Sequence, residues 1–261
     1  MNLNNLPQEI TELDQWVCAL DGSKAPMQAF DLLPASSTKS STWCSFETAK
    51  SAVSCERYDY VGFVFNDNGI VGIDIDDGYD QEGFLTPLAT DIIAACKSYT
   101  ERSRSGRGFH ILLKGDLPFK GKNNRNGVEI YKTARYFIMT GDVLLYDAII
   151  DNQDAIDYIV GKYFPEMREC QGKCFAPKIY EPKWDNPIEN GKIKLRPNYP
   201  PITLGSRNIC LTSLAGMLHS QGYSTQAIYD ELTYCNAIAC KPMLHDSEIM
   251  AIVNSVTRYT R

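Results

Sequence analysis

The sequence lacks a long hydrophobic run and the commonest nucleotide- and metal-binding signatures. No apolar stretch approaches the ~20 residues that a membrane span needs, and residues 1–16 are polar and acidic where a secretory leader is basic and then apolar. The motifs GxSxG, HExxH and GxGxxG are absent. Gly115 and Gly121 are separated by five residues, whereas the two glycines of a P-loop are separated by four, so a P-loop is absent as well. We therefore expect a cytoplasmic protein without a membrane anchor.

Basic charge is also in short supply. The chain holds 26 Lys and Arg residues against 32 Asp and Glu residues, a formal net charge of −6 at pH 7. Proteins that coat nucleic acid through charge alone are basic, so that class is excluded. The hydrophobic content of 44% is ordinary for a globular chain, and the length suits one large domain with at most a small appendage.

Paired CxxC motifs are missing, although the chain has nine cysteines. Two looser pairs stand far apart in the sequence, whereas structural zinc sites have tighter paired spacing. We therefore expect reduced thiols, mostly buried as small hydrophobes, and no zinc. The two looser pairs are Cys170 with Cys174 and Cys235 with Cys240, and His245 lies near the second pair.

Composition divides the chain into three zones. In residues 1–165, short apolar runs alternate with turn clusters, which predicts a mixed α/β or α+β domain. Residues 166–201 are rich in proline and lysine and predict a connector. In residues 202–261, apolar positions recur every three or four residues and Ser224 can cap a helix, which predicts a small all-α bundle of three helices.

The first zone contains five strand patterns and two helical patterns. The tight-turn sequence Asp-Asn-Gly at residues 67–69 separates the first two strands and predicts a hairpin between them. The predicted strands are residues 60–65, 70–75, 109–114, 128–131 and 136–140, and the predicted helices are residues 45–54 and 90–99.

Charges of opposite sign are segregated in the first zone. Residues 66–92 hold seven acidic residues and no Lys or Arg, whereas residues 100–135 hold nine cations against three acids. This arrangement suits a site where carboxylates hold metal and cations hold phosphate. Two solvated surfaces of opposite sign would give the same pattern, and charge alone does not separate the two interpretations.

Two aspartates alternate with isoleucines in the run Ile73-Asp74-Ile75-Asp76. Successive side chains of a strand point to opposite faces, so Asp74 and Asp76 share one face. Adjacent carboxylates with no basic neighbour repel each other unless a divalent cation lies between them. The alternation favours a metal site over the alternative, a strand that simply ends in an acidic turn.

The run Ser-Arg-Ser-Gly-Arg-Gly-Phe-His, from Ser103 to His110, combines glycines, hydroxyls and arginines directly before a strand. A turn of this kind that exposes backbone N–H groups binds anions, and His110 at the start of the strand can face the phosphate. The alternative is a flexible basic loop with His110 merely half-buried.

Glu129 alternates with apolar neighbours and is a candidate for a third carboxylate on the face of Asp74 and Asp76. Arg135, at the head of the following strand, can form a charge-assisted contact with phosphate. The alternative is an ion pair between Glu129 and Arg135 across two strands.

The order of these motifs resembles the archaeo-eukaryotic primase superfamily, in its primase-polymerase branch from phages, prophages and plasmids. The tail resembles the small type 1 primase C-terminal helical domain that often follows such domains. In the catalytic part, the resemblance is carried by Asp74-x-Asp76, Ser105-Gly106-x-Gly108-x-His110, Glu129-Ile130-Tyr131 and Arg135-Tyr136-Phe137-x-x-Thr140-Gly141. Upstream, it is carried by Trp16, Lys24-Ala25-Pro26 and Ser41-Thr42-Trp43, with Phe46-Glu47 and Ala49. In the tail, it is carried by residues 205–208, 214–216, Asn236, 240–242 and 255–259.

The resemblance implies an α+β catalytic domain with an RRM-like antiparallel or mixed sheet, followed by the helical bundle. It implies a template-directed nucleotidyl transferase that makes short primers on single-stranded DNA, and extends them, in phage, prophage or plasmid replication. Two Mg²⁺ or Mn²⁺ ions about 3.5–4 Å apart would activate the 3′-hydroxyl and neutralise the triphosphate. The implied catalytic metal ligands are Asp74, Asp76 and Glu129, and the implied nucleotide contacts are Ser105, Gly106, His110 and Arg135.

The implied partners are a single-stranded DNA template, NTPs or dNTPs and a separate replicative helicase, inside a bacterial or infected host cell. Asp142 competes with Glu129 for the third acidic position, but it follows Gly141 in a predicted turn. Two other functions stay open: a non-catalytic module that binds single-stranded nucleic acid through strand aromatics such as Tyr60, Tyr131 and Tyr136, and a metal-dependent nuclease.

Overall fold

The computed structural model of the chain describes residues 2–80, 83–123, 126–169, 199, 201–220 and 222–258. The chain forms two compact units, one of residues 1–78 and 87–187 and the other of residues 79–86 and 188–261. Most of the predicted connector, residues 166–201, lies outside the described residues together with Cys170 and Cys174. Its first residues form the short helix α5 (Glu166–Glu169).

The strands of the first unit form two separate sheets. Within each sheet, every pair of neighbouring strands is antiparallel. The three-stranded sheet has the order β1 (Trp16–Ala19), β2 (Tyr60–Asn66), β8 (Thr133–Met139). The five-stranded sheet has the order β4 (Thr100–Arg102), β5 (Phe109–Lys114), β3 (Ile70–Ile75), β7 (Val128–Tyr131), β6 (Gly121–Asn123). All five predicted strands form, and β1, β4 and β6 are short strands that the sequence patterns missed.

The predicted hairpin between β2 and β3 is wrong, because the two strands belong to different sheets. The turn itself is tight, with positive φ angles of 54° at Asp67 and 84° at Gly69. Both edges of each strand are taken: β2 pairs with β1 and β8, and β3 pairs with β5 and β7. The turn therefore passes the chain from one sheet to the other.

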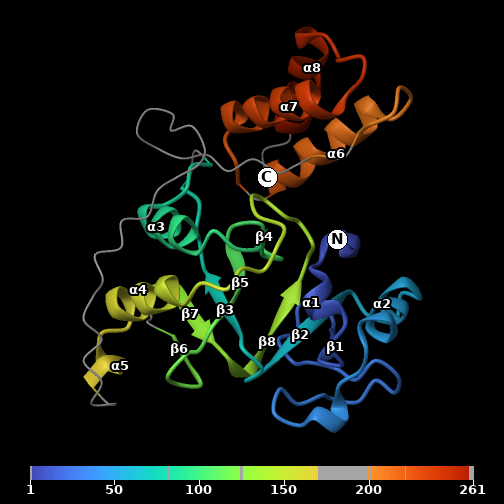
Figure 1. The fold of residues 1–261 in the computed structure, drawn as a ribbon. Helices are drawn as coiled ribbons and strands as arrows, with labels where there is room; N and C mark the ends of the chain where they lie inside the picture. Colours follow the sequence, from blue (N-terminus) through green and yellow to red (C-terminus); the bar gives the residue numbers. More distant parts are fainter. Residues whose placement is uncertain are drawn as a thin grey trace. The chain divides into compact units, whose positions relative to one another are not determined.

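Helices lie on two sides of the sheets of the first unit, with α1 (Gln8–Thr11) and α2 (Phe46–Ser54) on one side and α3 (Pro87–Cys96) and α4 (Gln153–Tyr163) on the other (Figure 1). The helix α2 packs against β1, and α3 packs against both β5 and α4. Ser45 caps α2 by accepting a hydrogen bond from the Thr48 N–H at 3.3 Å. The second predicted helix ends early, at Cys96, because Lys97 adopts a positive φ of 46°. The described helices of this unit, besides α5, are η1 (Leu3–Asn5), α1 (Gln8–Thr11), η2 (Ser40–Thr42), α2 (Phe46–Ser54), α3 (Pro87–Cys96) and α4 (Gln153–Tyr163), and only α2 and α3 were predicted.

Aromatic side chains of the three-stranded sheet pack on β3 of the five-stranded sheet. The rings of Phe65 and Phe137 lie 4.8 Å apart in an edge-to-face arrangement. Both cover Gly72, where a Cβ atom would collide with the Phe65 ring and come within 2.7 Å of Phe137. Because Gly72 and Asp74 lie on the same face of β3, this packing ends where the polar residues of that face begin.

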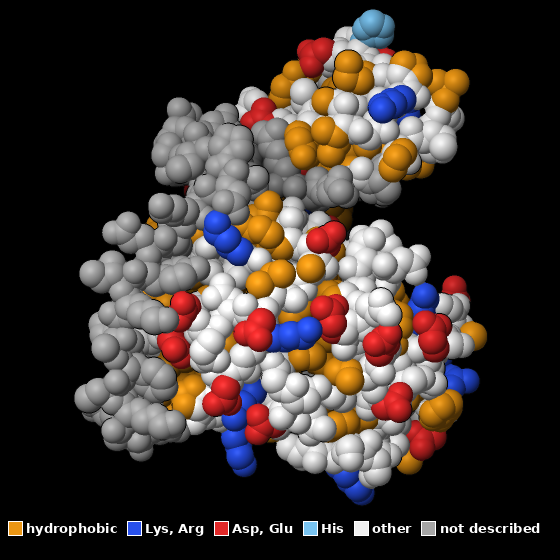
Figure 2. Space-filling view, in the orientation of Figure 1, with side chains coloured by type: hydrophobic (Ala, Val, Ile, Leu, Met, Phe, Trp, Pro, Cys, Tyr) orange, Lys and Arg blue, Asp and Glu red, His pale blue; other side chains and the backbone are white. Residues whose placement is uncertain are grey.

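The second unit contains three helices around an apolar centre. Ser224 caps the second helix by accepting a hydrogen bond from the Ala227 N–H at 3.2 Å, as predicted. Hydrophobic side chains also gather on its visible face (Figure 2). The helices are α6 (Arg207–Ser220), α7 (Thr225–Ala239) and α8 (Asp246–Thr257), and the central residues include Leu211, Leu218, Ile228, Leu232, Ile249 and Val253. None of the described helices combines the length and apolarity required to cross a membrane.

Cysteine burial predicts a two-class alkylation pattern in the native protein. Burial raises the pKa of both Cys18 and Cys235 to about 12, whereas Cys55 and Cys210 are exposed. Because the thiolate is the reactive form, brief treatment with iodoacetamide should modify Cys55 and Cys210 before Cys18 and Cys235. Peptide mass spectrometry measures this order, and a urea-unfolded sample is the control in which the difference disappears. Equal alkylation rates of Cys18 and Cys55 in the native protein would contradict the burial of Cys18.

Candidate active site and nucleotide-binding groove

Five polar side chains stand opposite one another on the five neighbouring strands of the larger sheet. We call this set the polar row; in spatial order it is Glu101 (β4), His110 (β5), Asp74 (β3), Glu129 (β7) and Asn123 (β6). Residues directly opposite in an antiparallel pair project from the same face. The neighbours Ile73 and Ile75 point to the other face and are fully buried. The row therefore places polar groups from residues 74 to 129 side by side on one face.

The polar row opens into a cavity of about 520 Å³, which we call the site groove. Six of the predicted site residues line it: Asp74, Asp76, Ser105, His110, Glu129 and Arg135. Gly106 does not line it; with φ of 75°, it forms the turn of its loop instead. The groove also has contributions from β8 and from residues 23–37, so both sheets form its walls.

Electrostatic repulsion is concentrated at Asp74. Burial raises the pKa of Asp74, and the charges of Asp76 and Glu129 raise it further, against the opposing effect of His110. Only 19% of the Asp74 side chain is exposed. A cation between Asp74 and Asp76 would relieve this repulsion, so the pair is suited to a divalent metal ion.

Glu129 is held by two partners. Its Oε2 atom accepts from Arg135 Nη2 at 2.7 Å, and its Oε1 atom accepts from Asn123 Nδ2 at 2.5 Å. The ion pair between Glu129 and Arg135, one of the two interpretations of these residues, is thus present. The Glu129 carboxylate is largely buried, since 11% of its side chain is exposed. In this conformation both Glu129 oxygens are engaged.

The donor set fits a hard cation bound by two carboxylates. Mg²⁺ is commonly held by one or two carboxylates, with water and substrate phosphates completing its shell. Asp74 and Asp76 provide such a pair at the groove, and oxygen is the donor that Mg²⁺ and Mn²⁺ prefer. Within the described part of the chain, no three His, Cys, Asp or Glu side chains are arranged to hold one ion together. Glu129 would therefore have to leave Arg135 or Asn123 before it joined a metal.

His110 is fixed on three sides. Its Nδ1 atom lies 3.0 Å from Glu101 Oε1, its Nε2 atom lies 3.8 Å from Asp74 Oδ1, and its ring stacks on Phe137 with 4.8 Å between centroids. Burial lowers the pKa of His110, but the hydrogen bond to Glu101 and the charge of Asp74 outweigh this, so its pKa lies above the usual value. The imidazole is therefore a suitable partner for an anion in the groove.

The loop from Ser103 to Gly108 is more compact than an open anion-binding turn. The N–H groups of Ser103 and Gly106 donate to backbone carbonyls within the loop, each at 2.9 Å, and the Arg107 N–H donates to the Ser105 hydroxyl. These three N–H groups are engaged within the loop. Ser103, Arg104 and Ser105 line the groove, so hydroxyl and guanidinium groups are also available there as donors.

Most cations of the basic segment are paired with acids. Arg107 pairs with Asp77 at 3.2 Å and Lys132 with Asp67 at 3.0 Å, which joins the predicted acidic and basic segments directly. The other pairs are Arg102–Asp142, Arg104–Asp21, Lys114–Glu9, Lys122–Glu166 and Arg135–Glu129. Arg125 lies outside the described residues. The segment is therefore a network of ion pairs, and Arg104 and Arg135 are its members that line the groove.

The groove lining includes residues outside the predicted site, among them Lys24 and Ser37, and Glu101 lies behind His110 without lining the groove. Lys24 and Ser37 belong to an N-terminal segment that forms one wall of the groove. Two hydrogen bonds connect this segment to β8: Tyr136 Oη donates to the Lys24 carbonyl, and Ser37 Oγ donates to the Ala134 carbonyl. The Lys-Ala-Pro run marked this segment only as part of the resemblance. Glu101, which reaches His110, was counted only as a charge, because a three-residue strand gives no periodic signal.

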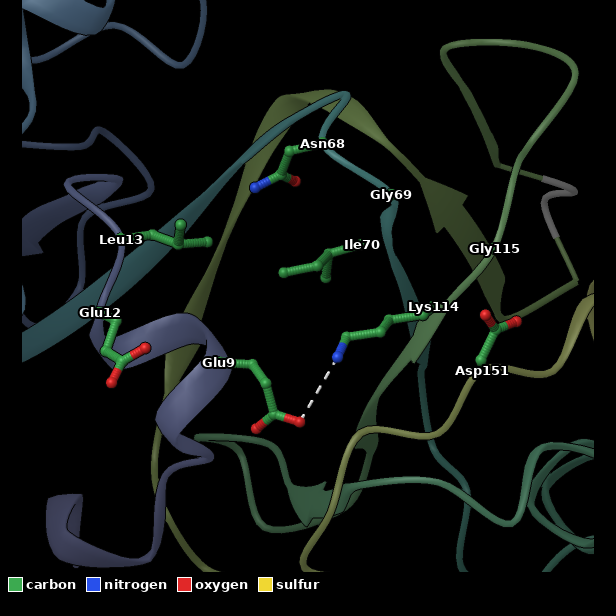
Figure 3. A pocket seen from close by; sticks show the side chains of 9 residues that line it. All are labelled: Glu9, Glu12, Leu13, Asn68, Gly69, Ile70, Lys114, Gly115 and Asp151. Carbon is green, nitrogen blue, oxygen red and sulfur yellow. Dashed lines mark ion pairs between the residues drawn. The ribbon is translucent and has the colours of Figure 1, made fainter.

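A second pocket, of about 590 Å³, contains none of the predicted site residues. Figure 3 shows its side chains, with Glu9 paired to Lys114 at 3.6 Å. Glu12 and Asp151 add two further carboxylates to the lining. A pocket with three acids and one lysine is unfavourable for phosphate.

Comparison with known proteins supports the resemblance to primases. Residues 197–261 match the family described as Primase C terminal 1 (PriCT-1). A DNA Primase-polymerase of Nitratiruptor phage NrS-1 is 29% identical over 148 residues, which is 54% of this chain and 20% of that protein. The chain thus spans about a fifth of the length of the relative. The resemblance to phage-type primase-polymerases with a primase C-terminal domain is confirmed.

Proposed function

We propose that this chain is a primase-polymerase that transfers nucleotides in a template-directed, metal-dependent reaction, making and extending short primers on single-stranded DNA. The observation that carries the proposal is the in-register placement of Asp74 between His110 and Glu129, on the face that opens into the site groove. Carboxylates for a metal and cationic groups for a triphosphate are thereby combined in one cavity. The similarity to a phage primase-polymerase supports the same reaction class.

The groove residues divide into those for metal and those for phosphate. Asp74 and Asp76 would hold Mg²⁺ or Mn²⁺, with Glu129 as a further ligand after release from Arg135. The bound metal supplies activation of the 3′-hydroxyl and neutralisation of phosphate charge. His110, Arg135 and the hydroxyl of Ser105 bind and orient the triphosphate, because positioning of the reacting groups accounts for much of the rate in phosphoryl transfer.

The proposal gives each predicted domain a role. We assign catalysis to residues 1–165, a connecting role to residues 166–201 and template or primer binding to the helices of residues 202–261. The partners are the DNA template, NTPs or dNTPs and a replicative helicase. Phage, prophage or plasmid replication is the setting that the similarity favours, inside a bacterial or infected host cell.

The alternative of a non-catalytic binding platform finds less support in the side chains. Tyr136 donates to the Lys24 carbonyl, Arg104 lies over the Tyr60 ring and Arg135 lies over the Tyr131 ring. These aromatics are half-buried and engaged, whereas base stacking requires an open ring face. Carboxylates beside them would also repel a phosphate backbone unless a metal were bound.

The direct test is primer synthesis on circular single-stranded DNA. The protein is supplied with all four NTPs or dNTPs, labelled ATP or dATP, and Mg²⁺ or Mn²⁺. Short labelled products are the expected result, and the nucleotide incorporated identifies the sugar preference. Extension of an added primer without initiation would restrict the function to polymerisation. Absence of both activities, with DNA binding retained, would favour the binding module.

A further inference from the structure

Glu101 is a carboxylate with no solvent contact, at one end of the polar row. Its residue exposure is 0%. Burying such a group is costly unless hydrogen-bond donors surround it. Tyr99 Oη donates to it at 2.7 Å, the Gly141 N–H at 2.8 Å and the Thr140 N–H at 3.1 Å. His110 Nδ1 is the fourth partner, at 3.0 Å. Only that last contact leads to a residue that lines the site groove.

The contact with His110 determines how the imidazole faces the groove. Glu101 and His110 are directly opposite in the ladder of β4 and β5, so their side chains share a face. A carboxylate that only accepts requires a proton on Nδ1, and the imidazolium, with its second proton on Nε2, can donate to an anion on the other side of the ring. Nε2, on the far side of the ring, is then directed toward Asp74, and stacking on Phe137 prevents the ring from tilting.

We propose that Glu101 is a positioning residue for the nucleotide: it holds the His110 ring by Nδ1 and thereby presents Nε2 to the triphosphate in the site groove. This role rests on the proposed function, because it assumes that His110 meets a triphosphate. Small errors in the placement of such a group are costly, since a displacement of about 1 Å can reduce a rate about 100-fold.

Glu101 also ties the backbone of Thr140 and Gly141 to β4, so a test must separate positioning from structural support. Glu101→Gln keeps the size of the side chain but places an N–H donor among groups that are themselves donors. Tyr99→Phe is the matched control, because it removes one hydrogen bond to the same buried carboxylate and leaves the contact with His110 in place.

The first readout is the imidazole N–H proton of His110 in the full chain. Only three histidines are present, so ¹⁵N-histidine labelling gives few signals, and His110→Ala identifies the one of interest. We expect a downfield, slowly exchanging Nδ1–H resonance in the wild-type protein and in Tyr99→Phe, and its loss in Glu101→Gln. Retention of this resonance in Glu101→Gln would overturn the proposal.

The second readout is nucleotide affinity, measured by calorimetry with dATP and ATP in the presence of Mg²⁺. We expect affinity to fall about 10-fold or more in Glu101→Gln, the range found for residues that orient functional histidines, with unchanged affinity for single-stranded DNA. Equal losses in Tyr99→Phe and Glu101→Gln, or unchanged nucleotide affinity in Glu101→Gln, would refute positioning. Absence of primer synthesis by the wild-type protein would refute the proposed function alone, because both readouts are independent of turnover.

Discussion

Replacing Asp74 with alanine is expected to reduce primer synthesis by at least about 100-fold. A bound metal ion contributes several kcal/mol to the stabilisation of charge in a transition state, and each 1.4 kcal/mol, roughly, is a factor of ten in rate. Asp74 is the carboxylate at the centre of the polar row, between His110 and Glu129. Labelled-primer assays on single-stranded DNA with Mg²⁺ or Mn²⁺ measure the effect.

The same substitution should leave the protein folded. Because burial and like charges raise the pKa of Asp74, its ionised form is disfavoured in the native state, and alanine removes that unfavourable charge. The melting temperature should therefore not fall. Asp77→Ala is the matched control, since Asp77 is an exposed neighbour outside the groove lining and should keep wild-type activity. Primer synthesis above a tenth of the wild-type rate in Asp74→Ala would refute the metal assignment.

Phe65→Ala is expected to have the largest effect on stability. Phe65 is fully buried, and its ring contacts those of Phe63 and Phe137 with centroids 5.5 Å and 4.8 Å away. Because it also covers Gly72, it joins the two sheets. Truncation of a buried phenylalanine costs about 3–5 kcal/mol, a large share of the roughly 5–15 kcal/mol that stabilises a typical domain.

Urea unfolding followed by tryptophan fluorescence measures this loss, since Trp16 lies in the same core. Phe30→Ala is the control: the Phe30 side chain belongs to a residue that is 73% exposed, and its removal should change the free energy of unfolding by less than about 0.5 kcal/mol. A cost below about 1 kcal/mol for Phe65→Ala would show that the two sheets do not depend on this contact.

Local patterns were sufficient to predict the strands that carry the site. Asp74, His110 and Glu129 each lie in a strand whose alternation was visible in the sequence, and those strands form at the expected residues. Their mutual register was not visible, because it depends on pairing between segments far apart in the chain. The patterns predicted which side chains of one strand share a face, and the pairing of the strands places Asp74, His110 and Glu129 side by side.

The errors have the same physical origin. An Asp-Asn-Gly turn normally returns a strand onto its neighbour, but here both strands have other partners on each edge. Glu101 was missed because charged side chains are rarely fully buried, and its burial depends on donors from Tyr99, Thr140 and Gly141. Such compensation is a tertiary property that periodicity does not report.

The line of polar residues across five strands also determines where the chain tolerates changes of length. A one-residue slip in a strand turns its side chains to the opposite face, so deletion of a residue within β3 would put an isoleucine where Asp74 stands. Added residues in the connection between β5 and β6, by contrast, leave every pairing unchanged. Insertions and deletions are therefore tolerated in the loops of this fold and excluded from its central strands, independently of how well the core is packed.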